Sequence, residues 1–404
     1  MSGLDPDNWD ALRQLGHRML DDMIDRLSHL REQPVWQPMP TGLRQELRTG
    51  LPDGPSAPED LYARFQQLVV PYSTGNVHPG FMGWVHGGGT AIGMLSELLA
   101  GGLNANCGGR DHAPIEVERE VIRWAAQICG FPTDCSGLLV TGSSMANMIA
   151  VITASRAVPD GLAMRHAGVG TRRLTGYAAA SAHGCISRAF DLTGLGSDAL
   201  RIIPVDQDNR MILPELENAI ARDRAAGYEP FIVVGTAGTV DTGSIDDLDM
   251  LANIAAREKL WFHVDGAFGA LAALSPDLRP MLRGMERADS IAFDFHKWAQ
   301  VQYDAGCILV RDPTLQAAAF AQSRSYLARE DRGLATNGPW FCDLGPDLSR
   351  GFRALKVWMT LGTYGAERMG EMVAGCCAIA RHLARRVEEN PRTELLAPVT
   401  LNIV

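Results

Sequence analysis

The stretch D-F-H-K-W-A-Q, residues 294–300, carries one of only three lysines in a chain of 404 residues. The other two are Lys259 and Lys356, and arginine fills every remaining Lys/Arg position. Arginine supplies surface charge but cannot form an imine with an aldehyde, whereas a lysine in a buried site can. Lys297 is therefore a candidate for covalent chemistry. Lys259 and Lys356 are expected to be surface charges on helices.

The composition is that of a globular protein and argues against several classes of partner. Hydrophobic residues make up 46% of the chain, charged residues 21%, and the net charge is −10. This charge argues against nucleic-acid binding, and no apolar run has the length of a membrane span. The polar, acidic start is unlike a signal peptide, and the eight cysteines show no zinc-ligand spacing. We expect a cytoplasmic protein with reduced thiols, no metal, and no membrane or nucleic-acid partner.

Apolar runs alternate with helix-like segments after an N-terminal helix (8–32) and an extended arm rich in proline and glycine (34–58). The runs predicted to be strands are residues 137–142, 175–182, 201–205, 231–238, 260–268, 290–296 and 306–312. This rhythm predicts an α/β fold with a mostly parallel central sheet covered by helices. In such sheets the chemistry collects at the carboxyl ends of the strands.

Three parts are expected along the chain. Residues 1–75 would form the N-terminal helix and arm, 76–365 the large domain, and 366–404 the start of a truncated small C-terminal domain.

Polar residues follow several of the predicted strands. Ser143 and Ser144 come after the first strand and open a helix, where backbone N–H groups favour an anion, although an ordinary N-cap has the same pattern. His183 and Thr236 follow two later strands, and each alone is weak evidence for a site. Together they place anion-binding and titratable groups at one edge of the sheet.

Asp265 ends the strand in H-V-D-G-A-F-G, where a buried carboxylate is costly without a cationic partner. We expect His263 to point to the opposite face of that strand, which argues against a metal pair. A phosphate site, a strand-end aspartate and Lys297 on a further strand are together what pyridoxal 5'-phosphate requires. The lysine would form a Schiff base, and the aspartate would keep the pyridine nitrogen protonated.

At this point the sequence resembles the group II pyridoxal-phosphate-dependent amino-acid decarboxylases. The resemblance rests on N-V-H-P-G-F-M-G-W (76–84), T-G-S-S-M-A-N-M, S-A-H-G-C-I-S-R-A-F, H-V-D-G-A-F-G-A, D-F-H-K-W and L-S-R-G-F-R-A-L-K-V-W-M-T-L-G-T-Y-G (348–365). It implies fold type I of the pyridoxal-phosphate enzymes and a homodimer with the active site at the subunit interface.

The resemblance also implies roles for individual residues. Lys297 forms the Schiff base, Asp265 pairs with the pyridine nitrogen, and His183 stacks on the ring and can deliver a proton. The remaining cofactor contacts implied are Ser143, Ser144, Thr236, Ala267 and His296. On the substrate side the resemblance implies His78 and Pro79.

Two departures from the family pattern bear on the reaction. Many family members carry a tyrosine on a loop before the S-R-x-F-R-A-L-K helix, whereas an ungapped count puts Phe341 there, with Tyr326 upstream. Phenylalanine in that place is compatible with an oxygen-dependent reaction that yields an aldehyde, and misalignment of a variable loop is the competing explanation. The stretch 103–114 offers Asn104 and Asn106 where aromatic-specific relatives have bulky apolar residues.

The expected reaction is decarboxylation of an L-amino acid to its amine. An aromatic substrate is favoured, with Trp84 as a candidate aromatic wall and Asn106 and Phe341 as further candidate substrate contacts. A small polar or acidic amino acid is the alternative. A non-catalytic cofactor-binding subunit and another fold type I enzyme, such as an aminotransferase, are the rival interpretations.

Overall fold

The computed structural model describes residues 3–322, 329–336 and 338–404. The chain divides into an N-terminal unit, Met1–Ala91, and a C-terminal unit, Ile92–Val404. The three-part division expected from the sequence, with boundaries after residues 75 and 365, stays a prediction.

The N-terminal unit is built from α-helices, short 3-10 helices and irregular segments. Helix α1 (Trp9–Ser28) begins after Asn8, whose side chain accepts hydrogen bonds from the backbone N–H groups of Asp10 and Ala11. Helices α2 (Thr41–Glu46) and α3 (Pro58–Leu68) follow. Much of the predicted arm, 34–58, is irregular, and α2 lies within it.

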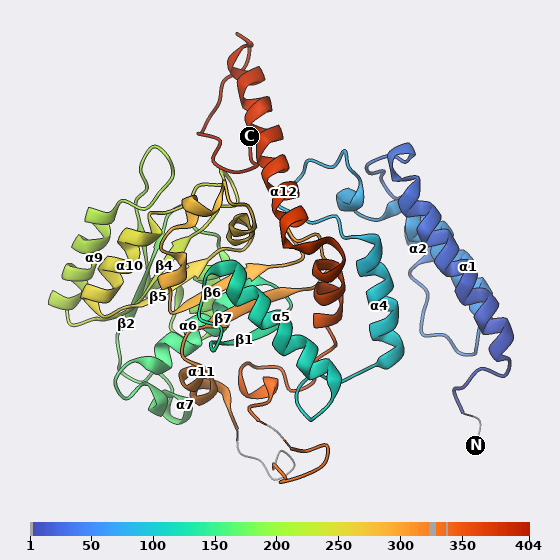
Figure 1. Ribbon diagram of the computed structural model, residues 1–404, viewed down its shortest axis with the longest axis horizontal. Coiled ribbons are helices and arrows are strands. Elements are labelled where there is room, and N and C mark those ends of the chain that lie inside the picture. Colours follow the sequence, from blue (N-terminus) through green and yellow to red (C-terminus); the bar gives the residue numbers. More distant parts are fainter. Residues whose placement is uncertain (1–2, 323–328, 337) are drawn as a thin grey trace. The chain divides into compact units, whose positions relative to one another are not determined.

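The C-terminal unit contains a seven-stranded sheet in the described part of the chain, in the order β1-β7-β6-β5-β4-β2-β3 (Figure 1). The strands are β1 (Ser136–Val140), β2 (Leu174–Ala179), β3 (Leu200–Ile203), β4 (Glu229–Thr236), β5 (Trp261–Asp265), β6 (Ser290–Asp294) and β7 (Gly306–Val310). Each falls on one of the apolar runs predicted to be a strand.

Parallel pairing joins β3, β2, β4, β5 and β6, whereas β7 is antiparallel to both of its neighbours. The connection from β6 to β7 spans residues 295–305 and contains no helix, so the chain reverses instead of crossing over. The predicted α/β class with a mostly parallel sheet is confirmed.

Helices cover both faces of this sheet. Those of the C-terminal unit are α4 (Ala91–Leu103, which starts at the unit boundary), α5 (Ala113–Cys129), α6 (Ser143–Ala157), α7 (Met164–Ala167), α8 (Cys185–Leu192), α9 (Leu213–Ala225), α10 (Leu248–Glu258), α11 (Pro313–Phe320) and α12 (Ala354–Glu388). A Cβ on Gly137 would meet Ile122 of α5, whereas Leu138, next in β1, lies beside α6. Since successive residues of a strand face opposite ways, α5 and α6 cover opposite faces.

The turn between β1 and α6 lies directly against the start of β7. A Cβ on Gly306 would lie only 2.4 Å from the Cα of Gly142, so this contact between two backbones requires glycine. The close approach brings the amino end of α6 next to the segment that follows β6. These are the two segments on which the sequence predicts the phosphate site and the lysine.

Two further features concern the whole described chain. Helix α12 is interrupted at Gly365, whose φ of 74° is not helical. Among the described residues, no helix combines the length and apolarity needed to span a membrane, and no cluster of His, Cys, Asp or Glu could hold a metal ion. All eight cysteines are free.

Candidate active site

Lys297 lies just after β6, in contact with a carboxylate that the sequence analysis did not select. Its Nζ is 3.1 Å from Oδ2 of Asp294, the last residue of β6. Oδ1 of Asp294 accepts a hydrogen bond of 2.7 Å from the backbone N–H of Ser143. The buried Asp294 therefore connects the lysine to the amino end of α6.

The predicted phosphate site lies at this amino end of α6, around Ser143 and Ser144. The Ser143 hydroxyl is buried and has no hydrogen-bond partner among the described residues, while Ser144 is exposed in the same first turn. His296 is buried nearby, with its Nε2 3.6 Å from Asp294 Oδ2. Its Nδ1 accepts from the backbone N–H of Ala305, so Nε2 carries the proton, and burial lowers the pKa of His296.

Asp265 is buried at the carboxyl end of β5 and is surrounded by donors. Oδ1 accepts from the backbone N–H of Ala267 at 3.1 Å, and Oδ2 accepts from Nδ2 of Asn147 at 3.2 Å. The Cys185 thiol lies 3.9 Å from Oδ2, and burial raises the pKa of that thiol to about 12, so it keeps its proton. Burial raises the pKa of Asp265, while the positive charge of Lys297 opposes the rise. A further positive charge close to Asp265 would stabilise its ionised form.

The expectation that His263 faces away from Asp265 was wrong. Both side chains contact Asn147 of α6, because Nε2 of His263 lies 2.7 Å from Oδ1 of the same amide whose Nδ2 reaches Asp265. Residues two apart in a strand share a face, which is the signal that the sequence analysis misread. Asn147 itself, one turn into α6, was missed, because only packing of the helix on the sheet brings it to Asp265.

His183, Thr236 and Ala267 lie at or just beyond the carboxyl ends of β2, β4 and β5. His183 is exposed in the turn before α8, and its charge acts on Asp265. Thr236 ends β4, and its buried hydroxyl has no partner in the described residues. Its backbone N–H donates to Asp246. The structure therefore brings His183, Thr236, Ala267 and Lys297 to the same edge of the sheet as Asp265.

The candidate substrate residues are distributed differently. His78, Pro79 and Trp84 belong to the N-terminal unit, where Trp84 is 81% exposed and stacks on His86. In the C-terminal unit, Asn106 uses its side-chain oxygen to accept from the backbone N–H groups of Gly108 and Arg350. Their role toward a substrate stays a prediction.

Phe341 lies in a short 3-10 helix, Phe341–Asp343, and is buried. The guanidinium of Arg350 lies 5.1 Å from the centre of its ring. Tyr326, the other candidate for this place, lies outside the described residues. Phe341 therefore belongs to the buried core of the C-terminal unit.

The two remaining lysines differ from each other. Lys259 is exposed at the C-terminal end of α10, as the sequence predicts. Lys356 is not a surface charge, because it is buried and its Nζ lies 2.8 Å from Glu97 of α4. Only the packing of α12 beside α4 provides this partner.

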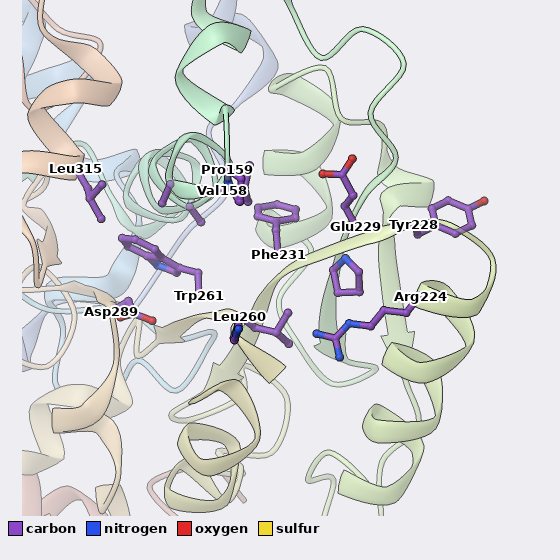
Figure 2. A pocket seen from close by; sticks show the side chains of 14 residues that line it. Val158, Pro159, Arg224, Tyr228, Glu229, Phe231, Leu260, Trp261, Asp289 and Leu315 are labelled. Atoms are coloured by element: carbon purple, nitrogen blue, oxygen red, sulfur yellow. The ribbon is translucent and has the colours of Figure 1, made fainter. Parts of the chain in front are cut away.

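A pocket of about 530 Å³ opens at the other edge of the sheet (Figure 2). It is lined by the first residues of β4 and β5, including Phe231 and Trp261, with Arg224, Lys259 and Asp289 around them. Asp265 is the last residue of β5, and Lys297 comes after the end of β6. The pocket therefore lies at the opposite ends of the strands from the candidate active site.

The residues at the carboxyl edge fit pyridoxal 5'-phosphate. Two buried hydroxyls, of Ser143 and Thr236, lack partners among the described residues, and buried polar groups are normally hydrogen-bonded. The amino end of α6 suits a phosphate, Lys297 offers the amine that an aldehyde requires, and Asp265 lacks only a close cation. The arrangement matches the donors and charges of this cofactor.

Comparison with known proteins agrees with this chemistry. Residues 40–404 match the model of the pyridoxal-dependent decarboxylase conserved domain. The chain is 30% identical over 403 residues to an aromatic-L-amino-acid decarboxylase of Bacillus atrophaeus, covering 98% of this chain and 81% of the relative. It is 27% identical to a phenylacetaldehyde synthase of Arabidopsis thaliana, covering 98% of this chain and 82% of the relative.

Among solved structures, the fold matches Oryza sativa TDC with PLP and tryptamine at a TM-score of 0.88. The sequence identity is 28%, and the match covers 99% of this chain and 84% of the other. The chain belongs to the pyridoxal-dependent decarboxylase family and is a pyridoxal-phosphate-dependent amino-acid decarboxylase.

Proposed function

We propose that the protein decarboxylates an aromatic L-amino acid to the corresponding amine and CO₂, with Lys297, Asp265 and His183 as its catalytic residues. The assignment of residues rests on the convergence of Lys297, Asp265 and two buried hydroxyls at one edge of the sheet. Neither hydroxyl has a partner among the described residues. The similarity to an aromatic-L-amino-acid decarboxylase and to TDC supports the aromatic substrate.

When bound, pyridoxal phosphate supplies an electron sink that makes loss of CO₂ from an amino acid feasible. Asp265 would keep a proton on the pyridine nitrogen, and its donors Asn147 and Ala267 hold the carboxylate in place for this. Lys297 would hold the cofactor through its aldehyde. Asp294 lies 3.1 Å from Lys297 Nζ and orients the amine of the lysine.

The other end of the cofactor would lie at the amino end of α6. Ser143 and Ser144 would bind the phosphate through backbone and hydroxyl groups, and His296 would contribute from the segment that follows β6. Thr236 would use its free hydroxyl near the ring or Asp265, and Ala267 would pack on the ring face. His183 would cover the opposite ring face and carry the proton that replaces CO₂.

Product analysis tests this proposal. Protein loaded with pyridoxal phosphate is incubated with a panel of L-amino acids, aromatic, acidic and small polar, and amine, aldehyde and hydrogen peroxide are measured in the same tube. Amine from an aromatic substrate without peroxide is the expected result. Preference for an acidic or small polar substrate would overturn the aromatic assignment and favour the reading based on Asn104 and Asn106.

A second candidate reaction is the oxygen-dependent formation of an aldehyde. It is favoured by Phe341, which an ungapped count puts where many family members carry tyrosine, and by the similarity to a phenylacetaldehyde synthase. Equal amounts of aldehyde and peroxide in the assay would establish it. The variant Phe341→Tyr should then shift the product toward amine, whereas in a true decarboxylase it should leave the product unchanged.

We further infer a homodimer with an interfacial active site. Helix α4 exposes Leu98, Leu99 and Leu103, and apolar side chains grouped in this way mark interaction surfaces. The mass of the protein in solution, measured by light scattering, should be twice that of the 43.7 kDa chain. A monomer that is fully active would overturn this inference.

A further inference from the structure

Five buried side chains form a continuous line of hydrogen bonds from the start of β5 to its end. Trp261 Nε1 donates to Ser290 Oγ at 2.8 Å, and Ser290 Oγ lies 2.8 Å from Nδ1 of His263. His263 Nε2 lies 2.7 Å from Oδ1 of Asn147, whose Nδ2 donates to Asp265 at 3.2 Å. The line begins at one edge of the sheet and ends at the candidate catalytic carboxylate.

The direction of these bonds follows from what each group can donate. An ionised Asp265 only accepts, so Asn147 must present its NH₂ to it and its carbonyl oxygen to His263. That carbonyl needs a donor, so Nε2 of His263 carries the ring proton. Nδ1 then accepts from the Ser290 hydroxyl, which in turn accepts from Trp261. Every donor in the line has an acceptor.

His263 is neutral in this arrangement, because burial lowers its pKa to about 3. A neutral imidazole has two tautomers, and the structure offers a partner to each. With the proton on Nδ1, the ring could instead donate to the backbone oxygen of Ser290, 3.1 Å away. The Ser290 oxygen could also accept from a protonated Nδ1, but among the described residues its own O–H proton has an acceptor only when Nδ1 is unprotonated. The Ser290 hydroxyl therefore favours the tautomer with the proton on Nε2.

We propose that Ser290, His263 and Asn147 are positioning residues for Asp265, in which the Ser290 hydroxyl selects the Nε2–H tautomer of His263 and thereby the orientation of the Asn147 amide. The proposal rests on the proposed role of Asp265 toward the pyridine nitrogen. In this proposal His263 holds its proton on Nε2 and does not transfer it.

The consequence for Asp265 is electrostatic. If Nδ1 carried the proton, Nε2 would be an acceptor, and the Asn147 amide would turn to donate to it. The amide oxygen would then face Asp265, so that two acceptors meet and the carboxylate loses a donor. A carboxylate without that donor is more readily protonated, and a protonated Asp265 cannot stabilise a protonated pyridine nitrogen.

The far end of the line supplies a matched control. Trp261 lines the pocket at the amino edge of the sheet (Figure 2) and only donates to Ser290. Trp261→Phe removes that donor but leaves the Ser290 hydroxyl free to donate to His263. Trp261→Phe should therefore keep the Nε2–H tautomer of His263. Like Ser290→Ala, it changes a buried side chain in the line, so it controls for general effects of packing.

The test measures the tautomer and the affinity for pyridoxal phosphate separately. With ¹⁵N-labelled histidine, NMR distinguishes a protonated from an unprotonated ring nitrogen, and His263→Gln assigns the signal. In cofactor-free protein we expect Nε2–H in the wild type and in Trp261→Phe, and Nδ1–H in Ser290→Ala. Affinity, followed by cofactor absorbance, should fall about tenfold in Ser290→Ala and less than twofold in Trp261→Phe.

A double variant tests whether the three residues act as one line. Asn147→Leu removes the final donor, so adding Ser290→Ala to it should lower the affinity no further. The proposal is overturned if Ser290→Ala retains Nε2–H, if its tautomer changes with no loss of affinity, or if the two substitutions are additive. Failure of the wild type to bind pyridoxal phosphate would instead overturn the proposed function, and the tautomers would still be measurable.

Discussion

The C-terminal unit contains two clusters of buried charge, and their hydrogen bonding differs. In the first cluster, Arg350 pairs with Glu118 through both terminal nitrogens and also donates to the backbone oxygens of Cys107 and Leu139. Glu118 further accepts from the backbone N–H of Leu139. Both side chains of the pair are fully buried, and only Nε of Arg350 lacks a partner in the described chain.

The second cluster, around Lys297 and Asp265, is incomplete. Two carboxylates, Asp265 and Asp294, share one lysine, and the nearby hydroxyls of Ser143 and Thr236 have no partner among the described residues. Removing one partner of a satisfied buried pair destabilises the fold, whereas buried groups that already lack partners lower stability and mark a place for a ligand. The comparison teaches that charge burial alone does not identify a site, whereas charge burial next to several unpartnered hydroxyls indicates one.

The largest expected effect is a loss of activity when Lys297 in the second cluster is replaced by arginine. The charge next to Asp294 remains, but the amine that reacts with an aldehyde is lost, so decarboxylation should fall by a factor of about 1,000 or more. Steady-state kinetics measures this, with Lys259→Arg as the control at an exposed lysine. Retention of more than a tenth of the activity would contradict the assignment.

Glu118→Gln should show the opposite behaviour, a loss of stability. The substitution leaves Arg350 buried without its counter-charge, which typically costs roughly 3–5 kcal/mol. Denaturant unfolding of the cofactor-free protein gives the free energy of unfolding. An unchanged free energy of unfolding would contradict the structural role of the first cluster.

Asp265→Asn should separate activity from stability. Loss of the negative charge should lower the rate about a hundredfold. Stability of the cofactor-free protein should stay the same or increase, because burial raises the pKa of this carboxyl and thus opposes its charge. The same kinetic and unfolding assays apply, and a fall in stability as large as that of Glu118→Gln would erase the contrast.

The last contrast concerns the acid side of the stability profile. His263 has a pKa of about 3 in the folded protein against an ordinary 6.5, so the unfolded chain binds more protons between these values. Stability should therefore rise with pH from 3 to 6.5, by up to about 1.4 kcal/mol per pH unit from this residue. His263→Gln should flatten that rise in cofactor-free protein, whereas His382→Gln, at an exposed histidine, should not. Parallel profiles for wild type and His263→Gln would contradict the burial of a neutral ring.

Much of the fold could be predicted from the sequence, because each strand is a short apolar run bounded by turn residues. The candidate site followed from the fold, since parallel strands bring their carboxyl ends, and so Thr236 and Asp265, to one edge. Lys297 was identified by its chemistry and by its place after a strand. These are local signals combined with one general rule about sheets.

What could not be predicted depends on contacts between distant segments. Asp294 bonds to the backbone of Ser143, and Lys356 finds Glu97 only when α12 packs beside α4. Asn147 reaches His263 and Asp265 through the packing of α6 on β5. Because His263 was expected on the opposite face of the strand, its link to Asp265 through Asn147 was not predicted. Strand period alone would have placed His263 correctly.

The central claim is that Lys297 is the residue that holds pyridoxal phosphate, and borohydride trapping tests it most directly. Protein loaded with the cofactor is reduced, digested and analysed by mass spectrometry. With only three lysines in the chain, the account predicts a pyridoxyl label on the peptide that contains Lys297 and on neither of the others. A label on Lys356 or Lys259, or an unlabelled Lys297 in active protein, would contradict it.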